Sequence, residues 1–215
     1  MRAVIFANGQ LSNPELIHLS ADELVIAADG GHRHCLALGL TPQVVIGDLD
    51  SLDQESQDQL TALGVPVIRH PRRKDYTDLE LALQYAVKQG SKEIAVYGAL
   101  GLRWDMTLAN LLLPAAADLS VARIWLLDGP QEITLLRAGQ LVKIIGNPGD
   151  TVSLIPIGGD ALGITTQGLE YPLNNENLYF GATRGVSNVL LSSPAQVQIT
   201  TGMLICTIIH LNSQG

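Results

Sequence analysis

The stretch Val44-Val45-Ile46-Gly47-Asp48-Leu49-Asp50-Ser51 decides the fold of the first part of this 215-residue chain. Its three consecutive β-branched apolar residues predict a strand that is covered on both faces, as in a parallel sheet. A glycine and two aspartates follow where that strand ends. Open α/β sheets bind their ligands beyond the carboxyl ends of the strands, so the stretch predicts a ligand site together with a strand.

Short apolar runs of the same kind recur on both sides of this stretch. The predicted strands are Ala3–Ala7, Leu24–Ala28, Val44–Ile46, Val65–Ile68, Ile94–Tyr97 and Ile124–Leu127. The helical patterns between them lie near Asn13–Leu19, His32–Leu38, Gln54–Leu63, Asp78–Gln89 and Met106–Ala116. Strands that alternate with helices at this spacing predict an open, mostly parallel α/β/α sheet domain over residues 1–130.

The pattern changes after Asp128-Gly129-Pro130, where helical periodicity gives way to short apolar runs separated by Gly, Thr, Ser and Pro. The strands expected there are Glu132–Leu136, Leu141–Ile145, Thr151–Pro156, Leu162–Thr166, Val186–Leu191, Gln196–Thr200 and Met203–His210. Short strands at this spacing predict a second, all-β domain over residues 131–215, either a small sandwich or a barrel.

The charge of the chain restricts its partners. The net charge is -8, and the concentrated basic segment is Arg69-His70-Pro71-Arg72-Arg73-Lys74. Nucleic-acid-binding proteins usually carry a basic stripe, so we expect a small anionic ligand and no nucleic acid. A solvated charged loop is the alternative interpretation of this segment.

The cysteines and the apolar runs indicate a cellular compartment. Cys35 and Cys206 each lie in an apolar segment, which favours free core thiols in a reducing environment over a disulfide. The apolar run at the N-terminus is too short for a signal peptide, and no run approaches the ~18 residues of a membrane span. We therefore expect a cytoplasmic protein with no membrane partner.

Carboxylates follow four of the predicted strands. They are Asp29 after the second strand, Asp48 and Asp50 after the third, Asp75 and Asp78 after the fourth, and Asp105, with Arg103, after the fifth. Asp29 precedes Gly30 and Gly31, which let backbone approach a ligand closely before a helix begins. A single aspartate before a helix is often a cap, and Thr77 with Glu80 forms a plausible capping box.

Four successive strand ends with carboxylates are harder to explain by capping alone. Together they predict an acidic, oxygen-rich pocket of the kind that Mg²⁺ needs when it also binds substrate phosphates. The basic side chains expected to offset this charge and hold phosphate oxygens are Arg72, Arg73, Lys74 and Arg103.

Motifs that the chain lacks narrow the class of enzyme. It has neither a Gly-x-x-x-x-Gly-Lys-Ser/Thr loop nor a Gly-x-Gly-x-x-Gly turn after the first strand. Asp48 and Asp50 follow the third predicted strand, whereas a phosphatase with an aspartyl nucleophile is expected to carry this pair on the first. The five histidines show no zinc-ligand spacing, and no Ser/His/Asp arrangement is evident.

Several of these segments, taken in order, resemble the thiamin pyrophosphokinase family. In the first domain they are Ala28-Asp29-Gly30-Gly31, Gly47-Asp48-Leu49-Asp50-Ser51, Asp75-Tyr76-Thr77-Asp78-Leu79-Glu80 and Gly98-Ala99-Leu100-Gly101-Leu102-Arg103-Trp104-Asp105. In the second they are Gly168-Leu169-Glu170-Tyr171-Pro172-Leu173 and Arg184-Gly185-Val186-Ser187-Asn188. Each motif alone is weak, but the ordered set spans nearly the whole chain.

The resemblance implies an α/β domain followed by a β-sandwich, assembled as a homodimer. It implies that ATP and thiamin react, with Mg²⁺, to give thiamin diphosphate and AMP. The first domain would hold the ATP and Mg²⁺ site, and the second would bind thiamin and form the dimer.

The resemblance also assigns roles to individual residues. Asp48, Asp50 and Asp78 would hold the metal, with Arg103 and Asp105 as further catalytic residues. The nucleotide would be bound by Asp29, Gly30, Gly31, Thr77 and Arg103. Ser187 and Asn188 would lie at the thiamin pocket, which this family forms between subunits.

The chain departs from the family's usual Gly-Gly-Arg-x-Asp-His turn at two positions. Leu102 stands in place of the second glycine and Met106 in place of the histidine. Two other functions therefore stay open: a pyrophosphokinase for another hydroxymethyl heterocycle such as a pterin, and a non-catalytic module that binds thiamin or a nucleotide. The sequence also leaves open whether Asp78 or Asp105 accepts the proton of the acceptor hydroxyl.

Overall fold

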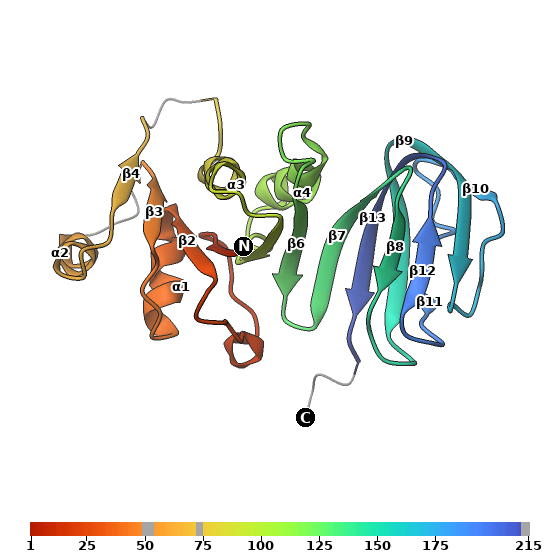
Figure 1. Ribbon diagram of the computed structural model, residues 1–215, viewed down its shortest axis with the longest axis horizontal. Helices are drawn as coiled ribbons and strands as arrows, with labels where there is room; N and C mark the ends of the chain where they lie inside the picture. The colour runs from red at the N-terminus through yellow and green to blue at the C-terminus, as the bar shows by residue number, and fades with distance from the viewer. Residues whose placement is uncertain (49–53, 72–74, 212–215) are drawn as a thin grey trace. The chain divides into compact units, whose positions relative to one another are not determined.

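The computed structural model describes residues 1–48, 54–71 and 75–211 (Figure 1). The chain divides into two compact units, Met1–Gly129 and Pro130–Gly215. The first unit is a sheet with helices, and the described part of the second consists of strands and loops. In the described residues, no helix is long and apolar enough to cross a membrane.

The sheet of the first unit has the strand order β4-β3-β2-β1-β5-β6. The strands are β1 (Arg2–Phe6), β2 (Leu24–Ala28), β3 (Val44–Gly47), β4 (Val67–Arg69), β5 (Glu93–Tyr97) and β6 (Arg123–Asp128). Every neighbouring pair in this order runs parallel. The chain builds outward from β1 to β4 and then returns to the other side of β1, so the order reverses between β1 and β5.

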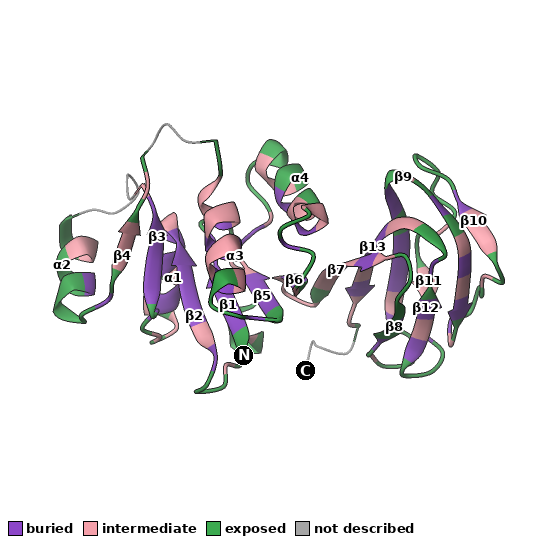
Figure 2. Cartoon of the chain, turned by 45° about the horizontal axis from the view of Figure 1, so that its top comes forward, coloured by how far each residue is buried: buried purple, intermediate pink, exposed green. Residues whose placement is uncertain are grey.

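Both faces of this sheet are buried, and Figure 2 shows the central strands in the colour of buried residues. On one face, Val4 and Phe6 of β1 cluster with Cys35 of α1 (His32–Ala37) and Leu60 of α2 (Gln54–Ala62). Since side chains alternate along a strand, Ile5 points to the opposite face, where α3 (Asp78–Lys88) contacts β1, β2 and β3. Two-sided burial accounts for the continuous apolar runs of the sequence.

Two of the predicted helices differ from the structure. The prediction of a helix over Asn13–Leu19 is wrong, because only a 3-10 turn, η1 (Pro14–Leu16), forms there. Asn13 has a left-handed backbone with φ 47°, and the extended backbone of Ile17 ends the turn. The helix predicted near Met106–Ala116 begins two residues earlier, as α4 (Trp104–Leu112), and ends in the turn η3 (Leu113–Ala115) at Pro114.

The prediction for the cysteines is confirmed, because Cys35 and Cys206 are both free and buried. Burial raises the pKa of the Cys35 thiol to about 12. A thiol with such a pKa carries almost no thiolate at neutral pH and is chemically inert. Cys35 is therefore a core residue.

The second unit is antiparallel throughout its described pairings. Its main order is β7-β13-β9-β12-β8, and β10 and β11 also pair with β9. The strands are β7 (Gln131–Arg137), β8 (Leu141–Ile144), β9 (Thr151–Gln167), β10 (Glu176–Leu178), β11 (Asn188–Val189), β12 (Ala195–Gln198) and β13 (Thr201–Ile209).

β9 is one long strand where the sequence predicts two, Thr151–Pro156 and Leu162–Thr166. Gly158 and Gly159 interrupt the apolar pattern, and their positive φ values of 70° and 142° bend the strand without ending it. The residues before the bend pair with β13 and those near its end pair with β12. The strand predicted over Val186–Leu191 is shorter than expected, because Ser187 has a left-handed φ of 61° just before β11.

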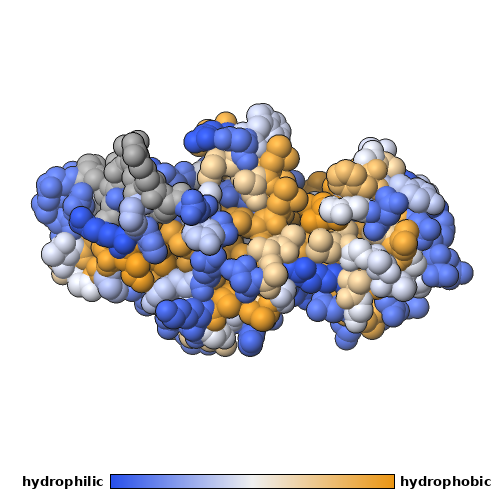
Figure 3. All heavy atoms as spheres, turned by 90° about the horizontal axis from the view of Figure 1, so that it is seen from above, coloured by the Kyte–Doolittle hydropathy of each residue, from blue (hydrophilic) through white to orange (hydrophobic). Residues whose placement is uncertain are grey.

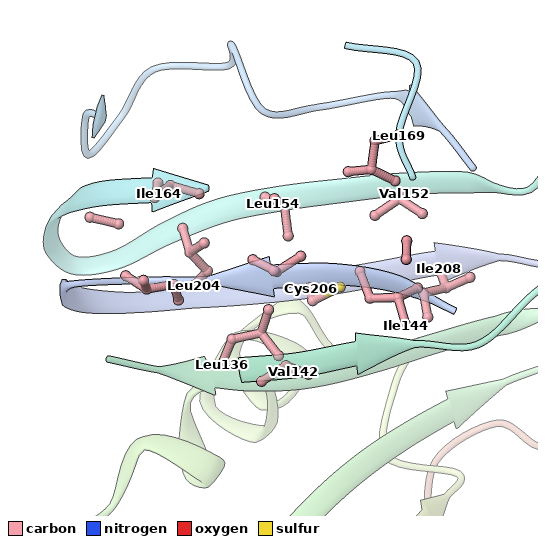
Figure 4. Close-up of a cluster of buried hydrophobic side chains, with 14 of the residues drawn as sticks. Leu136, Val142, Ile144, Val152, Leu154, Ile164, Leu169, Leu204, Cys206 and Ile208 are labelled. Atoms are coloured by element: carbon pink, nitrogen blue, oxygen red, sulfur yellow. The ribbon is translucent and has the colours of Figure 1, made fainter. Parts of the chain in front are cut away.

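The core of the second unit lies between its strands (Figure 4). Side chains of Leu136 on β7, Val142 on β8, Leu154 on β9 and Leu204 on β13 point toward one another there. Buried and exposed residues alternate along β8, as expected for a sheet with one face in the core, whereas β9 and β13 also contain runs of three buried residues.

A buried carboxylate fixes the end of β13. Asp150 is fully buried and accepts hydrogen bonds from the Asn147 N–H (2.8 Å), the Leu211 N–H (3.0 Å) and His210 Nδ1 (3.0 Å). Burial alone would raise the pKa of Asp150, but these hydrogen bonds outweigh it and hold the pKa below its usual value. The ionised form is thus the one that the fold stabilises.

We expect Asp150→Asn to lower the free energy of unfolding by about 2 kcal/mol, since the amide places N–H groups opposite N–H donors. A folded-state pKa below the unfolded value of ~3.9 stabilises the fold above that pH, and this stability is lost as the pH falls through the folded-state pKa. Denaturant unfolding from pH 7 to pH 2 measures both effects. Glu170→Gln, at an exposed carboxylate of the same unit, is the control, and equal losses in the two variants would contradict the assignment.

Candidate functional site

A cavity of about 390 Å³ lies in the first unit, beyond the carboxyl ends of β1, β2 and β5. Its wall is formed by Ala7, Asn8, Gly9, Ala28, Asp29, Asp48, Tyr76, Thr77, Asp78, Leu79, Gly98, Ala99, Gly101, Leu102, Arg103, Met106 and Asn110. This is the point at which the strand order reverses, where open α/β sheets bind ligands.

Two glycines bring the loops after β1 and β5 together. The Gly9 N–H donates to the Gly98 carbonyl oxygen at 2.7 Å. A Cβ atom on Gly9 would lie 2.4 Å from that oxygen, and one on Gly98, whose φ is 67°, would lie 2.7 Å from the Ala7 carbonyl oxygen. Larger residues at either position would separate the two loops, so this wall of the cavity requires glycine.

Asp29 is held in a left-handed backbone conformation, with φ 47°, at the start of the turn η2 (Asp29–Gly31). Asn8 Nδ2 donates to Asp29 Oδ2 at 3.1 Å, and Arg33 Nη2 donates to Asn8 Oδ1 at 2.7 Å. A non-glycine residue in this conformation costs about 1 kcal/mol or more, which the surrounding contacts must offset. Asn8 is therefore part of the site, although the sequence reasoning did not select it.

Gly30 and Gly31 are buried and do not line the cavity. A Cβ atom on Gly30 would lie 2.1 Å from Asn8 Oδ1, and one on Gly31 would lie 1.9 Å from the Phe6 carbonyl oxygen. The glycines thus let this turn pack against the end of β1. Their predicted contact with the nucleotide stays a prediction.

Asp48 and Asp78 line the same cavity as Asp29. A Cβ atom on Gly47 would lie 3.1 Å from Asp78 Oδ1 and 3.2 Å from Asp29 Cβ, so these two carboxylates approach each other across a glycine. Asp78 begins α3, and the side chain of the N-cap Thr77 accepts a hydrogen bond from the Glu80 N–H at 3.2 Å. Thr77 therefore has the predicted capping role and lies in the cavity wall as well.

One other predicted carboxylate does not join this group. Asp75 is exposed and is absent from the cavity wall. Asp50, together with Arg72, Arg73 and Lys74, lies outside the described residues.

The carboxylates of the cavity are ligands of the type that Mg²⁺ binds. Mg²⁺ binds oxygen ligands and usually takes only one or two protein carboxylates, with water and substrate phosphates completing its shell. Asp48 and Asp78 provide carboxylates in one cavity wall. Within the described ranges, no group of three or more His, Cys, Asp or Glu side chains could hold a metal ion.

Arg103 and Asp105 form an exposed ion pair at the N-terminus of α4. Arg103 Nε lies 3.1 Å from Asp105 Oδ1, and Arg103 Nη2 lies 2.5 Å from Asp105 Oδ2. The hydrogen bond from Arg103 lowers the pKa of Asp105, and the same bond raises the pKa of Arg103. Arg103 lines the cavity, whereas Asp105 does not, so Asp105 orients the guanidinium.

Comparison with known proteins identifies the family. The model of the thiamin pyrophosphokinase catalytic domain matches residues 17–126, half of the chain, and the model of the thiamin pyrophosphokinase vitamin B1 binding domain matches residues 140–204. The chain belongs to the thiamin pyrophosphokinase family.

Individual relatives agree with this assignment. A thiamine pyrophosphokinase of Bacillus subtilis is 29% identical over 182 residues, 85% of this chain and 85% of the relative. Thiamine pyrophosphokinase 1 of Oryza sativa is 30% identical over 158 residues, which cover 69% of this chain but only 59% of the plant protein.

Solved structures give the same result. The crystal structure of thiamine pyrophosphokinase from Bacillus subtilis has a TM-score of 0.89 at 27% identity, over 98% of this chain and 100% of that one. The thiamin pyrophosphokinase from Geobacillus thermodenitrificans has a TM-score of 0.87 at 26% identity, over 99% of both chains. The predicted family and class of enzyme are confirmed, as is an α/β region followed by a β region.

The two departures from the turn of thiamin pyrophosphokinases both lie in the cavity wall. Leu102 has a left-handed φ of 61°, the conformation for which the family's glycine is suited, and its side chain is 82% exposed. Met106 is the third residue of α4 and is partly buried. The turn thus has a left-handed backbone at a residue that is not glycine.

Ser187 and Asn188, predicted at the thiamin pocket, lie in the second unit. The Ser187 N–H donates to Ser153 Oγ at 3.0 Å. Asn188 Oδ1 accepts from the Tyr171 N–H at 3.0 Å, and Asn188 Nδ2 donates to the Tyr171 carbonyl oxygen at 2.8 Å. Asn188 therefore fixes the backbone of the exposed Tyr171, and its contact with thiamin stays a prediction.

We expect Leu102→Gly to leave the free energy of unfolding unchanged or to raise it by up to about 1 kcal/mol. Glycine relieves the strain of the left-handed backbone, which stabilises the fold, but it also makes the unfolded chain more flexible, which destabilises the fold. Because the Leu102 side chain is exposed, its loss removes little buried surface. Leu63→Gly is the control, since Leu63 is also exposed but lacks a left-handed φ, and it should cost about 0.5–1 kcal/mol. Chemical denaturation measures both, and an equal loss in the two variants would show that Leu102 is unstrained.

Proposed function

We propose that the chain transfers the diphosphoryl group of ATP to the hydroxyl of thiamin, giving thiamin diphosphate and AMP. The observation that carries this proposal is the cavity at the reversal of strand order, lined by Asp29, Asp48 and Asp78, in a member of this family. Membership of the family indicates the type of reaction but not the role of each residue, so the roles of the residues are part of the proposal.

The reaction is a single in-line displacement. The thiamin hydroxyl oxygen bonds to the β-phosphorus of ATP, the bond from that phosphorus to the oxygen bridging the α-phosphorus breaks, and AMP leaves with the bridging oxygen. Such transfers depend mostly on positioning and charge stabilisation. Arg103, oriented by Asp105, would bind the transferring phosphate oxygens.

Mg²⁺ would be held by Asp48 and Asp78, with Asp50 as the further predicted ligand. When bound, it supplies charge neutralisation for the phosphates and for the leaving oxygen of AMP. Asp29 and Thr77 would support the nucleotide in the same wall.

Of Asp78 and Asp105, Asp78 is the better placed to orient the acceptor hydroxyl. Asp105 is bonded to Arg103, which lowers its pKa and weakens it as a base. Asp78 lines the cavity and Asp105 does not. A group must reach the hydroxyl that it orients, which favours Asp78.

We further propose that residues 131–215 form a β-sandwich that binds thiamin, and that residues 1–130 carry the ATP site. The two family models, which match separate parts of the chain, support this division. The buried free thiols of Cys35 and Cys206 support the expected cytoplasmic location.

A homodimer is the proposed assembly. The resemblance assigns the dimer contacts to residues 131–215, and we propose a further interface on α4 of the first unit. Trp104, Leu108 and Leu112 form a stripe on α4, with 81%, 58% and 51% of each residue exposed. Residues four apart lie on one face of a helix, so these side chains make a continuous apolar surface. Hydrophobic residues gather over this part of the first unit in Figure 3. An exposed apolar stripe of this kind is typical of a protein interface.

Leu108→Glu should convert the dimer to a monomer. A charge buried in an apolar interface raises the dissociation constant at least about a hundredfold. Sedimentation equilibrium over a range of concentrations measures this constant. Leu63→Glu introduces the same charge at an exposed leucine outside α4 and should leave the dimer intact. A monomeric wild-type protein would contradict the proposed assembly.

The proposed reaction is tested by incubating the protein with ATP, Mg²⁺ and thiamin and separating the products by chromatography. We expect AMP and thiamin diphosphate in equal amounts. If AMP forms only with a pterin alcohol, the acceptor is a pterin and not thiamin. If both substrates bind without turnover, the chain is a binding module and not an enzyme.

Asp48→Asn should abolish Mg²⁺-dependent turnover, because the amide removes a charge from the proposed metal site. Asp48 is not among the buried residues of the core, so the thermal midpoint should stay about the same. Product formation and thermal unfolding are measured on the same preparation, with Asp118→Asn at an exposed carboxylate as control. Turnover at the wild-type rate would show that Asp48 does not belong to the metal site.

A further inference from the structure

Asn110 of α4 lies in the wall of the cavity and is only 5% exposed. Its Nδ2 donates to the Ala99 carbonyl oxygen at 2.6 Å. Its Oδ1 is buried and has no hydrogen-bond partner among the described residues. Leaving such an acceptor unbonded costs about 1–3 kcal/mol.

The orientation of this amide is fixed by its partner. The Ala99 carbonyl can only accept a hydrogen bond, so the amide nitrogen must face it and Oδ1 must point away. Oδ1 therefore requires a group that donates.

Two other buried polar atoms in the described part of the chain also lack a partner, and they provide a comparison. They are Ser91 Oγ and His32 Nε2. Neither residue lines the cavity. Asn110 alone among the three combines an unbonded polar atom with a place in the cavity wall.

We propose that Asn110 Oδ1 accepts a hydrogen bond from an O–H or N–H group of a bound substrate and so acts as a positioning residue. The proposal rests on the proposed function, since it concerns the same cavity. Phosphate oxygens are acceptors at neutral pH and cannot satisfy this atom. Asn110 thus contacts a part of the substrates other than the transferred phosphates.

The substrates offer two sources of such a donor. The nucleotide carries the amino group of its base and the hydroxyls of its ribose. The acceptor carries its reacting hydroxyl and an amino group. The chemistry required is the same, so the substrate whose KM changes identifies the source.

The test compares Asn110→Leu, which keeps the approximate volume and removes both polar atoms, with Ser91→Ala as the matched control. Steady-state rates are measured while ATP and thiamin are varied in turn. We expect the KM for one substrate to rise about tenfold or more in Asn110→Leu, with a smaller change in kcat. Ser91→Ala should leave both KM values unchanged.

A second comparison changes the substrates. Wild-type protein is assayed with ATP, with the nucleotide in which an oxygen replaces the amino group of the base, and with the 2′- and 3′-deoxynucleotides. Thiamin analogues that lack the amino group complete the set. In the wild-type protein, the analogue that lacks the donor bound by Asn110 should have a KM about tenfold higher than that of the natural substrate. In Asn110→Leu, the two KM values should be the same.

Several outcomes would overturn the proposal. One is a fall in thermal stability of Asn110→Leu with both KM values unchanged, which would make Asn110 structural only. Another is that Asn110→Leu shows the same changes in KM as the wild-type protein for every analogue that lacks a donor. If the wild-type protein forms no thiamin diphosphate, the proposed function fails instead, and calorimetric binding of ATP and thiamin to the two variants still decides the role of Asn110.

Discussion

The position of β1 between β2 and β5 is the constraint on which the site depends. β1 runs parallel to both neighbours, so three carboxyl ends meet at one edge of the sheet. The loops that follow can touch only because Gly9 and Gly98 lack side chains. Asn8 then reaches Asp29 from the next strand end. Residues that are distant along the chain become one cavity wall through backbone pairing and two close approaches.

Much of this arrangement follows from the sequence, because buried parallel strands and carboxylates at their ends leave distinct patterns. That reasoning selected Asp29, Asp48 and Asp78, which share the cavity. It missed Asn8 and Asn110 because it searched for charge. Asn8 did carry a signal, since it follows the first strand as Asp29 follows the second. Asn110 carried none, because a polar residue within a helix pattern is ordinarily exposed.

Other features depended on contacts that a sequence does not reveal. Gly30 and Gly31 suggested a ligand, but the atoms nearest to their missing side chains belong to Asn8, Arg33 and Phe6. The pairing of Arg103 with Asp105 separates two aspartates that look equivalent in the sequence. In the second unit, the paired glycines of β9 look like a break between strands and are a bend within one. In each case a local pattern had two physical explanations, and packing decided between them.

The electrostatics of the cavity link its parts to the proposed reaction. Asp29, Asp48 and Asp78 line a space that would receive a polyphosphate, in a chain of net charge -8. Like charges that share one cavity wall repel each other, and a polyphosphate adds further negative charge. Among the described residues of the wall, Arg103 is the cation, and it already forms an ion pair with Asp105. A bound divalent cation would turn this repulsion into attraction, so metal and nucleotide would each strengthen the binding of the other. Under the proposed function, the excess of carboxylates would then make nucleotide binding conditional on the metal.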